Sequence, residues 1–564
     1  MGPFSNQLRH VLRRLRRAPM FGAITLLTLA IGIGANTAIF SVVESVLLKP
    51  LPYPHPEQLV SIMHTAPGIH VADLSTAPSN YFVYRDESRT FQDVGLFRMD
   101  TVSVTGLAEP EQVRCVVVTD GFLPMLGVPP AMGRWFTRKD DSPGSPDTVM
   151  LTWGYWRRKF GADPAVIGRR IMADAKAREV IGVMPERFRF LDADPALIVP
   201  FQFDRSTTYL GNFSYRGLGR LKPGATVAQA SADVARMIPI LWDRFPAPPG
   251  MSVNMFLGAR LAPRLRPLRQ YVIGDVGSTL WVLMGTIGMV LLIACANIAN
   301  LLLVRTEGRQ QELAIRAALG AGRGRLAVEL FAESLTLAAV GGVLGLGLAR
   351  AALQLLVKLA PAGLPRLGEI GIDLPVLLFA LAISLVSGLL FGSLPVVRYA
   401  GSRLAQTLRG GGRTASQSRE RHRARNVLVV VQVALALVLL VSSGLMIRTS
   451  RALLRVQPGF TNPAELQTLQ ISLPNASVPD ERVATVQEEL VREIAAVPGV
   501  TGIGLSSTLP MDGNFSFDPI AAEDRRYAEN QVPPIRRFKL GTNGATELAI
   551  RRPPPWISNA RSGR

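Results

Sequence analysis

The residues that could carry nucleotide or catalytic chemistry are few in this sequence. A phosphate-binding loop needs a lysine directly after a glycine, and none of the seven lysines stands there. The five histidines do not cluster with cysteines or carboxylates, and neither HExxH nor GxSxG occurs. Asp140 and Asp141 form an acidic pair in RKDDSPGSPD, an ordinary loop composition. We therefore expect no enzymatic activity, no catalytic or metal-binding residue and no cofactor, so that another chain must bind any ATP.

The stretch QQELAIRAALGAGRGRLAVEL, residues 310–330, has residue types suited to contact with another protein. It predicts a short helix that ends before Gly320 and Gly322, with a charged pair at i,i+4 beside a small apolar surface. The residues concerned are Glu312, Leu313, Ile315, Arg316 and Ala317. Such a helix either lies passively among lipid headgroups or docks into a cytoplasmic partner. The pattern alone leaves both interpretations open.

Five apolar runs reach the roughly 20 residues that a helix needs to cross a ~30 Å hydrocarbon core. The chain is 48% hydrophobic, and its mean hydropathy of +0.23 is high for a soluble protein. Because only helices and closed barrels satisfy every backbone group in lipid, the runs should be helical. We predict an α-helical integral membrane protein with about five transmembrane helices, at 21–43, 279–304, 326–349, 374–397 and 427–447.

The net charge of +20 is concentrated beside these runs. Residues 1–20, 305–325 and 398–426 hold three quarters of it, and cytoplasmic loops are the ones enriched in Lys and Arg. We therefore predict a multi-pass protein of the bacterial inner (plasma) membrane with a cytoplasmic N-terminus, in contact with membrane lipid. Residues 49–270 and 448–564 then lie outside. Few aromatic residues accompany the basic segments, so no nucleic acid partner is expected.

The outside segment 49–270 has the pattern of a large mixed α+β domain. Runs rich in β-branched residues predict strands at 112–119, 147–152 and 178–184. Helical spacing predicts helices over 79–94 and 226–245. In the first of these helices the expected core residues are aromatic: Tyr81, Phe82, Tyr84 and Phe91.

The end of the chain suggests a second, incomplete copy of this arrangement. RHVLRRLRRAPMFGAITLLTLAIGIG and RHRARNVLVVVQVALALVLLVSSG share a basic lead followed by an apolar run. Residues 398–426 form a basic cytoplasmic linker between the two copies. Residues 448–564 begin another outside domain, and from about Arg525 we expect a disordered tail.

Polar and small residues inside the apolar runs indicate how the helices pack. Asn297 and Asn300, and Glu329 and Glu333, lie close to a membrane interface, where asparagine can bridge helices and glutamate can reach water. Small-residue steps permit close helix contact and favour packing and oligomerisation. Beside Ala30, Ala38 and Ser384, the glycines concerned are Gly34, Gly341, Gly345, Gly388 and Gly392.

Residues 305–349 resemble the cytoplasmic coupling segment and following helix of MacB/FtsX-type ABC permeases. The matching positions are Glu312, Ala314, Ile315, Arg316, Gly320, Ala321, Phe331, Glu333, Gly341, Gly342 and Gly345. The outside domain resembles the periplasmic core domain of that family through GRWFTRKDD (133–141), WGYWRRKFGADPAVIGRRI (153–171) and VIGVMPERFRF (180–190). The chain is most similar to the duplicated orphan permeases of acidobacteria, and it departs from them near Arg525, as expected for a second unit that is truncated.

The resemblance implies a permease subunit whose coupling segment is gripped by a separate cytoplasmic ABC ATPase. Closure of that ATPase would be transmitted through the helices to the periplasmic domain for export or extrusion of a substrate. A homo-oligomer or second permease, and a periplasmic accessory protein, are further partners that stay open. The alternative is a non-transporting membrane receptor or regulator whose periplasmic domain binds a cell-envelope partner.

Overall fold

The computed structural model describes most of the chain, with gaps mainly near its ends and in the loops between helices. The described residues are 19–107, 109–191, 193–248, 251–274, 276–309, 312, 315, 323–359, 366, 369–399, 415–456, 466–471, 478–506, 518–519, 535–536 and 546–550. They divide into a helical unit, built from segments before residue 50 and between 273 and 456, and a second unit that contains residues 50–272.

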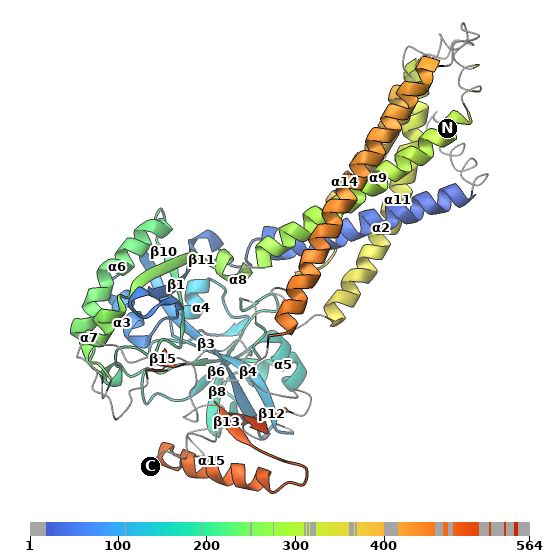
Figure 1. The fold of residues 1–564 in the computed structure, drawn as a ribbon. Coiled ribbons are helices and arrows are strands. Elements are labelled where there is room, and N and C mark those ends of the chain that lie inside the picture. The colour runs from blue at the N-terminus through green and yellow to red at the C-terminus, as the bar shows by residue number, and fades with distance from the viewer. Residues whose placement is uncertain are drawn as a thin grey trace. The chain divides into compact units, whose positions relative to one another are not determined.

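The helical unit consists of long apolar helices. They are α2 (Pro19–Val43), α9 (Val276–Glu307), α11 (Arg323–Leu359), α12 (Leu374–Tyr399) and α14 (Ala415–Leu454). α2 continues as a π-helical turn over Glu44–Leu48. All five are long and apolar enough to cross a membrane, which confirms the predicted number of spans. In Figure 1, α2, α9 and α11 run side by side, and α14 lies beside α9; α12 packs against α11 and α9.

The core domain is built on a mixed sheet of eleven strands whose main path is β11-β1-β10-β3-β4-β9-β6-β8-β5. β2 pairs with β1, and β7 pairs with β3 and β8. The strands are β1 (Leu59–Ala66), β2 (Val71–Leu74), β3 (Phe91–Thr105), β4 (Glu111–Val118), β5 (Met132–Gly133), β6 (Thr148–Leu151), β7 (Arg170–Ala173), β8 (Lys176–Val183), β9 (Leu197–Pro200), β10 (Arg216–Leu221) and β11 (Ala262–Pro267). The predicted α+β class is confirmed.

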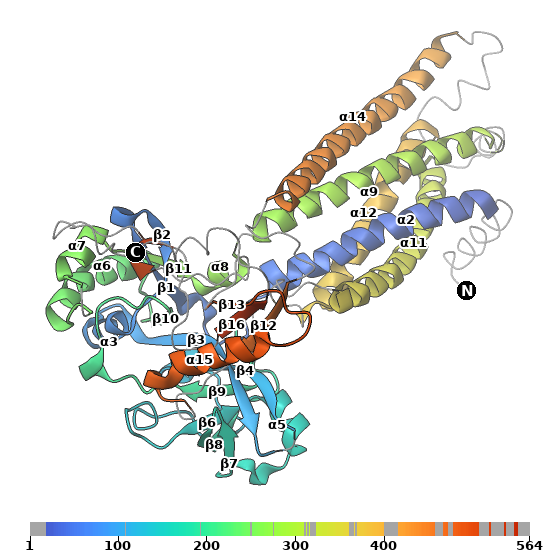
Figure 2. The ribbon, with the colours of Figure 1, turned by 60° about the horizontal axis from the view of Figure 1, so that its bottom comes forward.

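Helices cover this sheet, as the second view shows (Figure 2). They are α3 (Pro78–Glu87), α4 (Phe122–Leu126), α5 (Trp153–Phe160), α6 (Val227–Arg244), α7 (Val253–Ala259) and α8 (Leu268–Ile273). The long strand β3 contributes Leu96, Phe97 and Val102 to three different apolar clusters. It therefore joins the parts of the core domain into one body.

The helix expected over 79–94 is shorter than its periodicity predicts. α3 ends at Glu87, and Phe91 already begins β3. The Asp233 carboxylate on α6 accepts hydrogen bonds from the backbone N–H groups of Arg89 (2.7 Å) and Thr90 (3.0 Å). These contacts take the amides that a continuing helix would use, so a partner distant in sequence decides where the helix ends.

The acidic pair Asp140 and Asp141 holds the loop after β5 in place. Burial opposes ionisation of Asp140, but hydrogen bonds from Arg134 and Thr137 outweigh it and lower its pKa to about 2. Burial raises the pKa of Asp141 to about 6, although the backbone N–H groups of Asp120 and Gln202 donate to it. Both carboxylates are therefore bound by their own chain.

Beyond α14 the structure describes short elements. β12 (Gln467–Ile471), β16 (Thr546–Ile550) and β13 (Gly504–Ser506) form a three-stranded sheet, and α15 (Asp480–Ala495) precedes β13 in the chain. β14 (Asp518–Pro519) pairs with β15 (Ile535–Arg536). β15 and β16 thus lie within the tail that we expected to be disordered.

Candidate functional site

A buried glutamate on α11 lies beside arginines at the end of α9. Glu333 on α11 is 5% exposed, and its carboxylate lies 3.2 Å from Arg305 Nη1 and 3.5 Å from Arg309 Nη1. The expectation that Glu333 reaches water is wrong, because two arginines from the end of α9 enclose it. We call Arg305, Arg309, Glu312 and Glu333 the Glu333 cluster.

The Glu333 cluster also engages α2. The Arg305 guanidinium lies over the Phe21 ring, 4.6 Å from its centroid. A cation over an aromatic face is attracted by the ring quadrupole, by about 2 kcal/mol when the pair is desolvated. Arg305 therefore ties together three helices: its own α9, α11 through Glu333, and α2 through Phe21.

The predicted coupling segment joins the cluster through Glu312. Its carboxylate accepts a hydrogen bond from Arg309 Nε at 3.1 Å, so that Arg309 lies between Glu312 and Glu333. Ile315 is 59% exposed. The remaining predicted coupling residues, Leu313, Arg316, Ala317 and Gly320, lie outside the described residues.

The predicted packing glycines bring α2 and α11 into backbone contact. A Cβ added to Gly34 would lie 2.8 Å from the carbonyl oxygen of Gly345, and one added to Gly345 would lie 3.0 Å from the Gly34 nitrogen. One turn earlier on α11, a Cβ on Gly341 would lie 2.6 Å from Leu29 Cβ. Only glycine allows these two helices to approach so closely.

The other two predicted glycines lie between α12 and α11. A Cβ on Gly388 would lie 3.0 Å from both Ala338 and Leu335. Gly392 lies directly against the Ser334 hydroxyl, next to Glu333 in the chain. The α11–α12 contact is therefore tight at the level of the Glu333 cluster.

The opposite end of the helical unit holds a second ion-pair cluster. Arg366 forms an ion pair with Glu369 at 2.7 Å and donates a hydrogen bond to the backbone carbonyl of Lys49 at 2.8 Å. Ser41 donates to the Gly371 carbonyl at 2.5 Å, and Ser45 to the Glu369 carbonyl at 3.2 Å. The connection between α11 and α12 thus holds the end of α2.

Two short connections join the helical unit to the core domain. Residues 49–58 lead from α2 to β1, and residues 268–275 lead from β11 to α9. β1 and β11 are antiparallel neighbours, from Val60 opposite Pro267 to Thr65 opposite Ala262. The contacting helices α2 and α9 are therefore connected, through these two segments, to strands that are hydrogen-bonded to each other.

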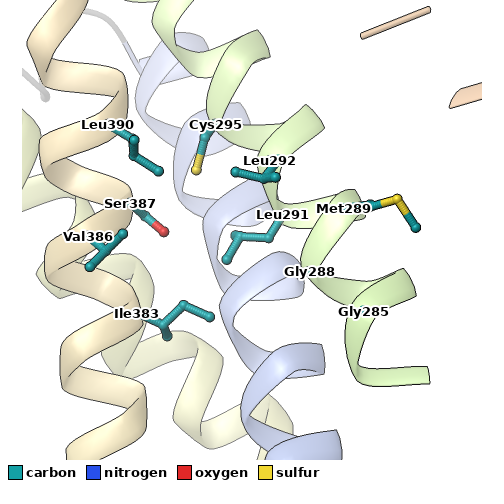
Figure 3. Close-up of a pocket in the computed structure, with 10 residues that line it drawn as sticks. All are labelled: Gly285, Gly288, Met289, Leu291, Leu292, Cys295, Ile383, Val386, Ser387 and Leu390. Atoms are coloured by element: carbon teal, nitrogen blue, oxygen red, sulfur yellow. The ribbon is translucent and has the colours of Figure 1, made fainter. Parts of the chain in front are cut away.

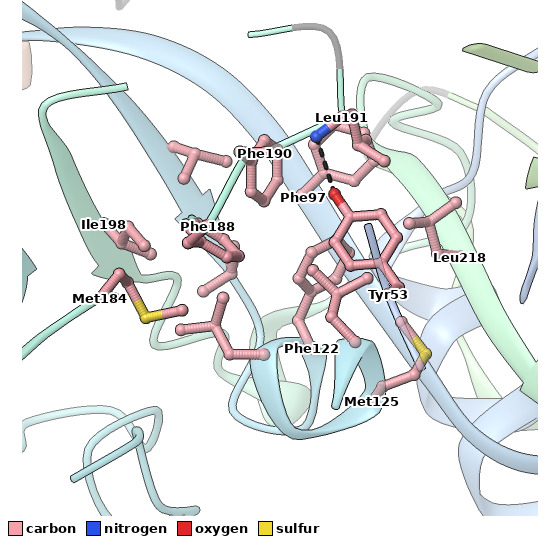
Figure 4. Packing of buried hydrophobic residues seen from close by; sticks show 14 of the residues in the cluster. Tyr53, Phe97, Phe122, Met125, Met184, Phe188, Phe190, Leu191, Ile198 and Leu218 are labelled. Carbon is pink, nitrogen blue, oxygen red and sulfur yellow. Dashed lines mark hydrogen bonds between the residues drawn. The ribbon is translucent and has the colours of Figure 1, made fainter. Parts of the chain in front are cut away.

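The first connection is anchored inside the core domain. Tyr53 is buried, its hydroxyl donates to the Arg189 carbonyl at 2.8 Å, and it accepts a hydrogen bond from the Leu191 N–H at 2.9 Å (Figure 4). The second connection contributes Leu268 and Val272 to the same apolar cluster. Both connections are therefore anchored in the same apolar cluster of the core domain.

An apolar groove of about 390 Å³ opens between α9 and α12. The side chains of Leu291, Leu292 and Ile383 line it, and Ser387 supplies a hydroxyl (Figure 3). Gly285 and Gly288 form part of the α9 wall. Such a lining suits hydrocarbon, from lipid or from another helix.

The arginine partners at both ends of the helical unit are not predicted from the sequence. Arg305 and Arg309 lie in the basic segment 305–325, whose charge indicates only the cytoplasmic side, and no pattern marks Arg366 and Glu369. A signal for the first pair was present, since a glutamate inside an apolar run needs a cation at the same depth. The spacing does not identify which arginine reaches it.

Two family models match successive parts of the chain. Residues 23–237 match the MacB-like periplasmic core domain, and residues 284–403 match the FtsX-like permease C-terminal region. The first match contains β1 to β10. The second contains Glu333 and the predicted coupling residues.

Several ABC transporter proteins are similar to this chain. The uncharacterized ABC transporter permease YknZ of Bacillus subtilis is 24% identical over 49% of this chain and 65% of its own length. The pyoverdine export ATP-binding/permease protein PvdT of Pseudomonas aeruginosa is 28% identical over 49% of this chain and 39% of its own length. The chain thus spans less than two thirds of these relatives.

Among solved structures, the periplasmic region of MacB from Actinobacillus actinomycetemcomitans matches 38% of this chain and 90% of that chain, at 11% identity and a TM-score of 0.28. The family matches, in contrast, identify both parts of the chain in order. With a MacB-like core domain followed by an FtsX-like permease region, the chain belongs to the MacB/FtsX-type ABC transporter permeases.

Proposed function

We propose that this chain transmits ATP-driven motion of a separate cytoplasmic ABC ATPase to its core domain, for export or extrusion of a substrate. The observation that carries the proposal is the pair of connections between helices and sheet. Residues 49–58 connect the helical segment that begins with α2 to β1, α8 connects β11 to α9, and β1 pairs with β11. A displacement of the two helices is then delivered to adjacent strands of a single sheet.

The Glu333 cluster supports the first step of this transmission. A partner that moves Glu312 pulls on Arg309, which is also paired with the buried Glu333 on α11. Arg305 extends the connection to α2 through Phe21. Breaking the ion pair would leave a buried charge without its partner, which is costly. The helices therefore move together with the predicted coupling segment.

The glycine contacts support the second step. Helices in backbone contact, such as α2 and α11 at Gly34 and Gly345, leave no room for side-chain rearrangement. Such helices move as rigid units by small shifts. The proposed output is a movement of the core domain that acts on a substrate or on an accessory protein.

The proposal predicts that a charge at Ile315 removes the ATPase. The full chain would be affinity-purified from membranes and the recovered proteins identified by mass spectrometry. We expect an ABC ATPase with the unaltered chain and at least tenfold less of it with Ile315→Glu, because a charge at an apolar contact must be desolvated on binding.

Leu359→Glu is the matched control. Leu359 is 72% exposed and ends α11, the helix that begins beside the coupling segment. The Leu359→Glu substitution introduces the same charge at the other end of α11, so ATPase recovery should be unchanged. Equal recovery with Ile315→Glu and with the unaltered chain would contradict the proposal.

A further inference from the structure

Helix α14 contacts the rest of the helical unit along one narrow stripe. Within 426–456 most side chains are exposed, and those partly covered are Leu428, Gln432, Leu435 and Leu439. Their spacings of four, three and four residues are those of a coiled-coil seam. α14 therefore has one defined face toward its neighbour.

That neighbour is α9, which α14 meets through a pair of amides. Gln432 Nε2 donates a hydrogen bond to Asn297 Oδ1 at 3.2 Å. Both residues lie inside predicted membrane-spanning helices. The hydrogen bond is therefore formed between two helices at membrane depth.

The sequence places the two amides at the same depth in the membrane, without reference to the contact between them. Asn297 lies eight residues before Arg305, and Gln432 lies seven residues after Arg425. At ~1.5 Å per residue, each amide is roughly 11 Å from the basic flank of its own helix. Two helices that cross in opposite directions would bring these residues to the same level.

A polar pair at this depth favours one register over the others. An amide without a partner in hydrocarbon is costly, and interhelical polar contacts stabilise the association of helices in membranes. A single polar residue in an apolar seam is a well-attested means of fixing register. Sliding α14 by one turn would part Gln432 from Asn297 and leave the Asn297 amide without this partner.

We propose that α14 is a docked fifth member of the helical bundle, bound to α9 of the same chain with its register fixed by Gln432 and Asn297. The segment after α14, which carries β12 and α15, is then attached to a helix that moves with the bundle. This inference does not depend on the ATPase, since it concerns a contact within one chain.

In the proposed antiparallel register, the remaining seam residues face specific positions of α9. Leu428, four residues before Gln432, corresponds to Leu301, four residues after Asn297. Leu439, seven residues after Gln432, likewise corresponds to Val290, seven residues before Asn297.

Cysteine cross-linking in the full chain tests the docking. Cys115 and Cys295 are replaced by alanine, and a protease site is inserted between 400 and 414. Asn297→Cys is combined with Gln432→Cys or, as the control, with Val430→Cys, which is 65% exposed and off the seam. After mild oxidation and cleavage, the first pair should keep the two fragments together at the size of one chain, at least tenfold more than the control.

A dimer-sized band would show that α14 pairs with a second copy, and equal yields from the two pairs would show that the stripe is not a seam. Either result overturns the proposal. The first cysteine pair replaces both amides. A second pair, Leu301→Cys with Leu428→Cys, keeps them and tests the same register. Its yield should fall several-fold when Asn297→Leu and Gln432→Leu are added, and an unchanged yield would show that the amides do not set the register.

Discussion

Glu333→Gln is expected to destabilise the helical unit by about 3–5 kcal/mol, the cost of breaking a buried ion pair by removing one partner. The substitution keeps the shape of the side chain and leaves Arg305 and Arg309 facing each other without the carboxylate between them. Thermal unfolding of the full chain in detergent should show a lower midpoint than that of the unaltered protein.

Glu312→Gln is the matched control for this prediction. Glu312 pairs with the same Arg309, but its side chain is 43% exposed. An exposed pair contributes about 0–1 kcal/mol, so the midpoint should hardly change. Equal shifts for the two variants would show that Glu333 is not enclosed as described.

A double substitution separates the loss of pairing from a failure to fold. Replacing both members of a buried pair with apolar residues is often neutral or stabilising. Arg305→Met with Glu333→Leu should therefore recover part of the midpoint lost in Glu333→Gln. A double variant that is less stable than the single one would contradict the account.

Gly34→Leu is expected to separate α2 from α11. A Cβ alone at this position would meet the backbone oxygen and Cα of Gly345, at 2.8 and 3.3 Å, and backbone atoms cannot rotate away. Overpacking costs typically 1–3 kcal/mol where neighbours can adjust, and more is expected here. Little folded protein should be recovered from membranes by size-exclusion chromatography.

Gly347→Leu is the control for this second prediction. It lies on α11 two residues beyond Gly345, and a Cβ there would have no atom within 4 Å. It makes the same chemical change on the same helix, so recovery should resemble that of the unaltered chain. A folded Gly34→Leu variant with unchanged stability would show that the two helices do not touch there.

The membrane helices were the part of the fold most open to prediction. Lipid leaves a long apolar run few alternatives to a helix, so length and hydropathy identified all five spans. The core domain was predictable as a class only. Its order of strands depends on pairings such as Val60 with Pro267, which no local pattern encodes.

The candidate site was also predictable only in part, because local patterns do not encode contacts between distant segments. Small residues at helical spacing indicated close packing, but the pairing of Gly34 with Gly345 depends on how two distant helices cross. The environment of Glu333 depends on arginines more than twenty residues earlier in the chain. The end of α3 likewise depends on Asp233, about 145 residues later.

Transmission of motion across the membrane requires the predicted coupling segment and the core domain to lie on opposite sides of it. Single cysteines at Ile315 and at Tyr209, both exposed, can be labelled with an impermeant maleimide in a chain without Cys115 and Cys295. We predict that Ile315→Cys reacts only in inside-out vesicles and Tyr209→Cys only in intact spheroplasts. Labelling of both positions from the same side would contradict transmission across the membrane.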